Sequence, residues 1–392
     1  MCYKLYRMLK SIDVFLFHGA CLDGGVSSYL FQKYGGVAGV FKYIPPGQAL
    51  INELLAGGVS KIALVDVALP SVKNVEILSK VALVVDHHLS SAQYVGLDSI
   101  GVIYKEDEST AGIIWSDILN FPQMPMILHA INKGDLGRLS KDTDPELFYI
   151  YIGLQSILEL NRRETRNDWT RFPNVLGYLV ENERDHIESI KQYGILKFLD
   201  EYGYVLSCLN EKNVGNLYFQ DKVYRCIFIS ARSTVTSLVA GKTLSREVLD
   251  IAIMKSRGRF SLRALSDVKD VDLIANELDP LGGGHAAASS AEINVDTITN
   301  KNIFDHLILN RIKENTIGNP VVLTEVPNPA MIQPITAGNL TVIGTIATMI
   351  DSISTLENDV FRPLILRARE QDIKRYKPTK LKATSKVFQP MD

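Results

Sequence analysis

The most informative segment of the sequence runs from Val81 to His88 and reads Val-Ala-Leu-Val-Val-Asp-His-His. Its first five residues are apolar and rich in valine, which favours a short strand buried on both faces, as in a parallel sheet. An acid and two histidines, Asp86, His87 and His88, follow this strand directly. In open parallel sheets ligands bind at the carboxyl ends of the strands, so these side chains indicate a candidate site at one edge of the sheet.

Two further apolar runs are also followed by metal-binding side chains. Asp13–Phe17 is a compact strand candidate that leads into His18 and Asp23, and Lys61–Val65 leads into Asp66. A single aspartate or histidine at a strand end is more often a turn or cap residue than a ligand. Three strand ends that carry metal-binding side chains together favour a shared site.

The elements between these strands predict an α/β architecture. We expect a helix from Gly25 to Tyr34, a strand over Val37–Tyr43 and another helix near Gln48–Ala56. Strands that alternate with helices are typical of a doubly wound domain built on a parallel sheet. We expect this N-terminal domain to span residues 1–145.

The pattern changes after this domain. Residues 146–205 indicate long polar helices, which we expect to connect two domains. A second, smaller α/β domain is expected over residues 206–320, followed by a C-terminal extension over residues 321–392. Within the second domain the strand candidates are Val223–Ser230, Ile251–Lys255 and Arg259–Ala264, and the helix candidates are Thr234–Lys242 and Asp270–Leu278.

The composition is that of a folded protein. Of the 392 residues, 46% are hydrophobic and 22% charged, and the net charge of −2 gives no indication of nucleic acid. No run approaches the roughly 20 apolar residues that a membrane helix needs. The four cysteines form no C-x-x-C pair, which favours a reducing compartment. We therefore expect a cytoplasmic protein without membrane contact.

The acids and histidines together suggest a two-metal site. Asp135 follows a helix candidate over Met126–Asn132 and adds a further acid to the set. Carboxylate and imidazole donors suit Mn²⁺ and similar divalent ions. Two such ions, roughly 3.5–4 Å apart, can promote displacement at phosphorus. Asp66, at the end of a central strand, is the natural candidate to bridge them.

These motifs resemble those of the DHH phosphoesterase superfamily. Leu83–His88 resembles its signature, His18–Gly24 its first motif, and Asp66 stands where its second-motif acid belongs. Ser109–Gly112 and Asp135–Arg138 are similar to its later motifs. The spacing is most similar to the nanoRNase B-like subgroup of oligoribonucleases and cyclic-nucleotide phosphodiesterases. The resemblance implies metal ligands at His18, Asp23, Asp66, His87 and Asp135, a phosphate contact at His88 and a supporting role for Asp86.

Cys21 departs from the superfamily pattern, because many members carry the first aspartate of a D-x-D motif there. A thiolate can bind a divalent metal, but it is softer than a carboxylate and must first lose its proton. The alternative is a small apolar side chain that only packs against the strand. The sequence does not separate these two interpretations.

The second domain resembles DHHA1, the accessory domain of the same superfamily. The matching motifs are Ser-Leu-Arg at residues 261–263 and Gly-Gly-Gly-His at residues 282–285. A glycine run lets backbone N–H groups approach an anion closely, and arginine suits bidentate phosphate capture. Ala-Ser-Ser at residues 288–290 stands where the family has a further glycine. The resemblance implies substrate-binding roles for Arg263, Gly282, Gly283, Gly284 and His285.

The resemblance also implies a hydrolase that uses two divalent ions, manganese above all, with cobalt or magnesium as alternatives. The expected substrates are short RNA or DNA oligonucleotides, cleaved to mononucleotides by an exonuclease. The same site could instead act on a 3′-phosphorylated adenylate or a cyclic dinucleotide. A third interpretation is a nucleotide-binding protein with a weakened site, which Cys21 and the altered glycine motif favour and the retained ligand set disfavours. The oligomeric state stays open.

Overall fold

The computed structural model describes residues 3–19, 21–44, 48–55, 61–67, 75–164, 172–208, 214–219, 222–244, 249–256, 259–265, 270–278, 283–285 and 288–292. The expected C-terminal extension and the end of the second expected domain therefore lie outside the described residues. Among the helices in these ranges, none combines the length and the apolar character that crossing a bilayer requires.

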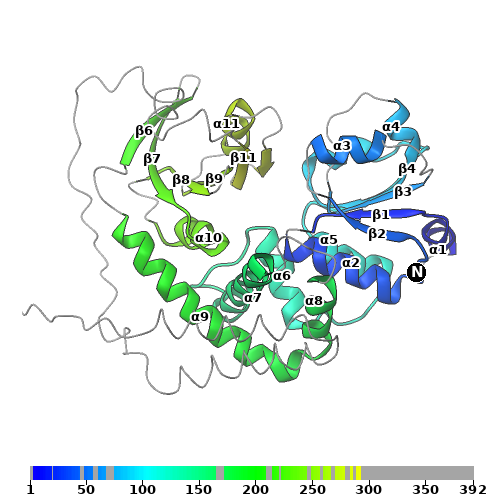
Figure 1. Cartoon of the computed structure of the whole chain (residues 1–392), viewed down its shortest axis with the longest axis horizontal. Helices are drawn as coiled ribbons and strands as arrows, with labels where there is room; N and C mark the ends of the chain where they lie inside the picture. Colours follow the sequence, from blue (N-terminus) through cyan, green and yellow to red (C-terminus); the bar gives the residue numbers. More distant parts are fainter. Residues whose placement is uncertain are drawn as a thin grey trace, which may run out of the picture. The chain divides into compact units, whose positions relative to one another are not determined.

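The first sheet has five strands, all parallel, in the order β2-β1-β3-β4-β5 (Figure 1). The strand order reverses between the neighbours β1 and β3. In doubly wound sheets of this order the ligand crevice opens at that switch point, beyond the carboxyl ends of the strands. The predicted doubly wound parallel sheet is confirmed. Its strands are β1 (Val14–Phe17), β2 (Val40–Tyr43), β3 (Ile62–Val65), β4 (Val81–Asp86) and β5 (Gly101–Tyr104).

Helices cover both faces of this sheet, as its apolar strands require. On one face Leu16 packs in a core with Leu50 and Ile77, which come from α3 and α4. On the other face the ring of Phe15 lies 5.7 Å from that of Phe31 in α2. The helices of this part are α1 (Tyr3–Lys10), α2 (Leu22–Tyr34), α3 (Gln48–Leu55), α4 (Val75–Lys80) and the 3₁₀ turn η1 (Leu89–Tyr94).

Several boundaries differ from the sequence predictions. Helix α2 begins at Leu22, before the predicted start at Gly25, because the side chain of Cys21 caps its first turn. Strand β2 is shorter than predicted, and α6 (Met126–Asp135) includes Asp135 instead of ending before it. Strand β5, helix α5 (Thr110–Ile113) and the π-helical turn η2 (Ile114–Ile118) were not predicted.

Long helices follow, as the polar pattern over residues 146–205 predicts. They are α7 (Pro145–Glu164), α8 (Phe172–Glu181) and α9 (Glu183–Ser207). Helices α7 and α9 pack together through aromatic side chains, since the rings of Phe148 and Phe198 lie 5.7 Å apart in an edge-to-face arrangement.

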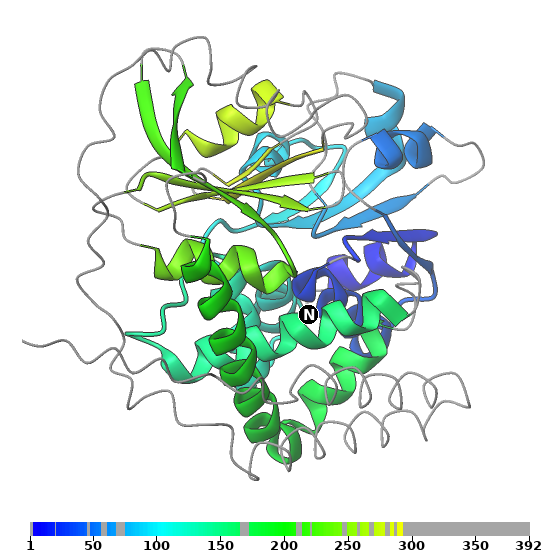
Figure 2. The same cartoon turned by 60° about the vertical axis from the view of Figure 1, so that its left-hand side comes forward.

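The second sheet has six strands in the order β10-β11-β9-β8-β7-β6, with β7 and β8 parallel and the other pairs antiparallel. Figure 2 shows its two helices on opposite faces. Leu262 of β9 is buried with Ile274 of α11, whereas Arg263 on the opposite face contacts Ser237 of α10. The elements are β6 (Val214–Phe219), β7 (Lys222–Ser230), α10 (Thr234–Thr243), β8 (Ile251–Ser256), β9 (Arg259–Ala264), α11 (Val271–Leu278), β10 (Gly283–His285) and β11 (Ala288–Glu292).

A second α/β unit is thus present, as predicted. The domain boundaries expected at residues 145, 205 and 320 stay predictions.

Candidate metal centre

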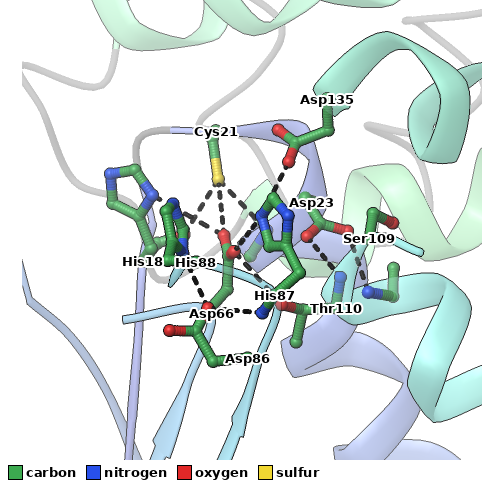
Figure 3. Close-up of polar contacts among 12 residues, drawn as sticks. His18, Cys21, Asp23, Asp66, Asp86, His87, His88, Ser109, Thr110 and Asp135 are labelled. Atoms are coloured by element: carbon green, nitrogen blue, oxygen red, sulfur yellow. Dashed lines mark hydrogen bonds and ion pairs between the residues drawn. The ribbon is translucent and has the colours of Figure 1, made fainter. Parts of the chain in front are cut away.

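The predicted ligands of the first domain gather at the carboxyl edge of the parallel sheet (Figure 3). His18 directly follows β1, Asp66 directly follows β3, and His87 and His88 follow Asp86, the last residue of β4. Strands β1 and β3 flank the switch point, so the sheet topology itself brings these side chains together. Three sets bring their ligand atoms within 4.8 Å of one another: His18, Cys21 and Asp66; Asp23, His87 and Asp135; and Asp66, Asp86, His87 and His88.

Asp66 is held in an unusual backbone conformation. Its φ is 58°, and among the described residues only Asn120 shares a positive φ without being a glycine. Aspartate enters this left-handed region more easily than most residues, although at some cost. The backbone N–H of Asp66 donates to the carbonyl of Val85, 3.0 Å away, which ties the turn to β4. Strain of this kind concentrates at functional sites.

The two carboxylate oxygens of Asp66 face different partners. Oδ2 lies 3.1 Å from Sγ of Cys21 and 3.6 Å from Nδ1 of His18. Oδ1 lies 3.5 Å from Nε2 of His87 and accepts a hydrogen bond of 3.3 Å from the hydroxyl of Thr110. Asp66 therefore stands between two donor groups and turns one oxygen towards each.

The donor group on the Oδ1 side consists of His87, Asp23 of helix α2 and Asp135 of helix α6. Nε2 of His87 lies 3.0 Å from Oδ2 of Asp135. Asp23 is fully buried, and its two oxygens accept 2.8 Å hydrogen bonds from the backbone N–H groups of Thr110 and Ala111, in the first turn of α5. Each carboxylate oxygen has two lone pairs, so Asp23 keeps acceptor capacity for a metal.

The group on the Oδ2 side contains Cys21. Its sulfur accepts a hydrogen bond of 3.1 Å from the backbone N–H of Gly24 and lies against Oδ2 of Asp66. Gly24 is required here, because an added Cβ would come within 1.8 Å of the carbonyl oxygen of His18. Burial, followed by the charges of Asp66 and Asp135, raises the pKa of the Cys21 thiol well above its ordinary value. A bound cation would act in the opposite sense and favour the thiolate.

Asp86 orients His88 and offers the weakest case for a direct metal contact. It is fully buried, and its oxygens accept from the backbone N–H of His87 at 2.8 Å and from Ser91 at 2.5 Å. Oδ1 also lies 2.7 Å from Nδ1 of His88, whose side chain is 27% exposed. Burial lowers the pKa of His88, but the charge of Asp86 outweighs it and raises that pKa to about 9. A cationic, partly exposed imidazole is suited to binding an anion.

The electrostatics show a surplus of acids. Burial and the nearby charges of Asp66 and Asp135 raise the pKa of Asp23 well above its ordinary value. Burial opposes a charge on Asp66 as well, yet hydrogen bonding to His18 and His87 holds its pKa well below the ordinary value. Burial opposes a charge on His87, but its hydrogen bonds to Asp135 and Asp66 raise its pKa to about 12. A divalent cation would relieve the same repulsion, so the donor set fits a metal.

Three residues that hold this arrangement were not among the predicted site residues. Thr110 contacts both Asp23 and Asp66, Ser91 contacts Asp86, and the side-chain oxygen of Asn132 accepts from the backbone N–H of Ser109 at 2.7 Å. In the sequence, only the segment Ser109–Gly112 could have indicated these supporting contacts. Ser109 caps helix α5, and the backbone N–H groups in the first turn of α5 bind Asp23, which lies far away in the sequence.

Arg263 lies close enough to Asp135 for their charges to interact. Its Nε donates to Ser237 at 2.9 Å. Burial lowers its pKa, while Tyr151 and Asp135 act in the opposite direction, so the charge of Asp135 reaches the guanidinium. Gly283 and Gly284 lie in β10, but Gly282 and the side chain of His285 lie outside what the structure describes.

Comparisons with known proteins give limited similarity. No protein-family model matches the chain, and no curated protein matches it. Among solved structures, the exonuclease RecJ bound to manganese is similar over 75% of this chain and 89% of that chain, with 13% identity and a TM-score of 0.42. RecJ from Thermus thermophilus in complex with Mn²⁺ is similar over 75% of this chain and 51% of that chain, with 14% identity and a TM-score of 0.41.

An exopolyphosphatase-related protein from Bacteroides fragilis is similar over 77% of this chain and 93% of that chain, with 15% identity and a TM-score of 0.38. The TM-scores and identities are low in all three cases. The case for a metal centre therefore rests on the geometry of the chain itself: a parallel α/β sheet whose switch point gathers carboxylates, imidazoles and a thiol.

Proposed function

We propose that the chain is a metal-dependent phosphoesterase of the DHH superfamily that works with two divalent ions. One observation carries the proposal: the two oxygens of Asp66 face two separate donor groups, one with His18 and one with His87. A carboxylate placed in this way can bridge two ions. When bound, such a pair of ions acidifies a water molecule and stabilises the oxygens of a phosphate undergoing displacement.

The other residues of the site would bind the ions or the substrate. His18 and Cys21 would complete one ion site, while Asp23, His87 and Asp135 would complete the other. Helix α5 keeps Asp23 in place through two backbone hydrogen bonds. His88, held by Asp86 and with a pKa of about 9, would donate a hydrogen bond to a phosphate oxygen at neutral pH.

The substrate class we propose is short RNA or DNA oligonucleotides, released as mononucleotides. This proposal is supported by Arg263, a cation of the second α/β unit whose charge interacts with that of Asp135. Arg263 is fixed through Nε by Ser237, and its two Nη groups would bind the phosphate. Arginine suits this role because its fork matches two phosphate oxygens.

The test is turnover of four substrates with Mn²⁺ present: a short RNA, a short DNA, a 3′-phosphorylated adenylate and a cyclic dinucleotide. We expect the short oligonucleotides to be hydrolysed fastest. Glu181→Gln, which changes a carboxylate contacted by α2 well away from the metal centre, serves as the control and should keep the parent rate. Faster turnover of the adenylate or of the cyclic dinucleotide would reassign the substrate, and hydrolysis of none of the four would contradict the proposal.

A further inference from the structure

The two donor groups that share Asp66 differ in chemistry. The group around His87 offers carboxylates and one imidazole, from Asp23, Asp135 and His87 itself. The group around His18 offers one imidazole, one carboxylate oxygen and the sulfur of Cys21. Two metal sites that share one bridging acid would therefore have unlike donors.

The surroundings of Cys21 are polar. Its sulfur lies 3.1 Å from Oδ2 of Asp66, 3.5 Å from the carbonyl oxygen of His18 and 3.1 Å from the backbone nitrogen of Gly24. An apolar packing residue would contact carbon atoms of the strand. The interpretation of Cys21 as a mere packing residue does not explain why its sulfur meets three polar groups.

The distances suit a shared ion. Metal bonds of about 2.0–2.3 Å to nitrogen, oxygen and sulfur place neighbouring ligand atoms of one ion about 3–3.7 Å apart. Oδ2 of Asp66 lies 3.1 Å from Sγ of Cys21 and 3.6 Å from Nδ1 of His18. One ion can therefore be in contact with all three atoms after small adjustments.

We infer that Cys21 binds, as a thiolate, the ion that His18 and Asp66 hold, and that the two metal sites consequently prefer different metals. This inference rests on the proposed two-metal function. Binding breaks the S–H bond, forms a sulfur–metal bond and releases the proton to solvent. Thiolate with imidazole selects a softer ion such as Zn²⁺ or Co²⁺, whereas carboxylates with one imidazole accept Mn²⁺ or Mg²⁺.

The experiment is a titration of the metal-free full chain with Co²⁺, followed by ultraviolet absorption and by calorimetry. A cobalt–thiolate bond gives a charge-transfer band that carboxylate and imidazole ligands do not give. We expect two Co²⁺ ions per chain, and the band should grow with only one of them. Zn²⁺ should then displace the sulfur-bound cobalt and abolish the band, whereas Mn²⁺, which binds more weakly than Co²⁺, should leave the band in place.

Cys21→Ser is the decisive variant, because serine is a good helix N-cap and can accept the bond from Gly24 as the sulfur does. It should lose the band and lower the affinity for one Co²⁺ at least about tenfold, since even groups one step removed from a metal contribute 10–100-fold. Cys208→Ser, which changes a partly buried cysteine at the end of α9, is the matched control and should keep the band. Cys21→Asp should lose the band and gain Mn²⁺ affinity.

The outcomes separate the two proposals. If two Co²⁺ ions bind and the band is absent from the parent, or persists in Cys21→Ser, the thiolate inference is wrong and the two-metal function stands. If calorimetry finds no metal binding at all, both are wrong.

Discussion

Helix α2 carries a polar cluster at each end, and the two clusters are built in opposite ways. At its N-terminus, Asp23 lies among other acids, and burial together with their charges raises its pKa. At its C-terminus, Glu181 of α8 accepts hydrogen bonds from Tyr29 and Tyr34, both 2.6 Å long, and from Lys33. The second cluster is balanced by a cation of the chain, whereas the first has a surplus of acids.

The difference indicates what each cluster is for. The balanced cluster around Glu181 stabilises the junction between helices α2 and α8 and requires no bound ion. A buried surplus of negative charge costs stability unless a proton or an external cation offsets it. Three measurements test this contrast and one tests the separation of substrate binding from metal binding, and those with the strongest expected response come first.

The largest effect should come from Asp66→Asn. Asparagine has the same shape and also tolerates the left-handed backbone, so the fold should survive. The charge that we propose to bridge two ions would be lost. Because metal-based stabilisation of the transition state is worth several kcal/mol, hydrolysis at saturating Mn²⁺ should fall at least about 100-fold. Steady-state rates measure this, and activity within tenfold of the parent would contradict the two-metal assignment.

Removal of metal should destabilise the parent. At a free ion concentration about 100 times the dissociation constant, each bound ion adds about 2.7 kcal/mol, and removal of both ions by a chelator should lower Tm by on the order of 5–10 °C. Thermal unfolding with Mn²⁺ and with a chelator measures this shift. Glu181→Gln should show the full shift, because its cluster needs no ion. An equally large shift in Asp66→Asn would mean that the ion binds elsewhere.

Arg263→Ala should affect substrate binding and leave the metals alone. Loss of a charge-assisted phosphate contact should raise KM about tenfold, with metal affinity unchanged. Ser237→Ala keeps the guanidinium but removes the hydroxyl that fixes Nε of Arg263 and that also contacts Ser261, so the rise in KM should be smaller, about two- to threefold. Steady-state kinetics together with calorimetric titration of Mn²⁺ distinguish these effects. A large drop in metal affinity would place Arg263 in the metal centre instead.

Glu181→Gln should leave activity unchanged and lower the free energy of unfolding at neutral pH by only about 0.5 kcal/mol, because the ion pair with Lys33 is partly exposed and screened by solvent. Burial opposes the charge of Glu181, but Lys33, Tyr29 and Tyr34 outweigh it and lower its pKa. The stabilisation is therefore complete above the unfolded-state pKa and is lost as pH falls through the folded-state pKa. Denaturant unfolding of parent and variant should converge at acidic pH, and a difference that grows with acidity would contradict this account.

Much of the site followed from the sequence because its residues stand at the ends of short apolar strands. The runs that end before His18 and Asp66 are buried along their whole length, which their composition indicates. Strand β5 was missed because all its residues are only partly buried and its sequence, Gly-Val-Ile-Tyr, is short. The contacts of Thr110 depend on two chain segments meeting in space, and no local pattern encodes such a meeting.

The left-handed backbone of Asp66 restricts which substitutions the chain can tolerate there. Glycine, asparagine and aspartate enter that conformation most readily, and of these only aspartate supplies a charged ligand. Glutamate keeps the charge but fits the left-handed backbone poorly. Every single replacement therefore loses either the favourable backbone conformation or the charged ligand. Cys21 has an extended backbone with φ of −133°, which any residue can adopt. The backbone therefore permits other residues at Cys21 but few at Asp66, and within the expected ligand set Cys21 is the position where this sequence differs from the pattern it resembles.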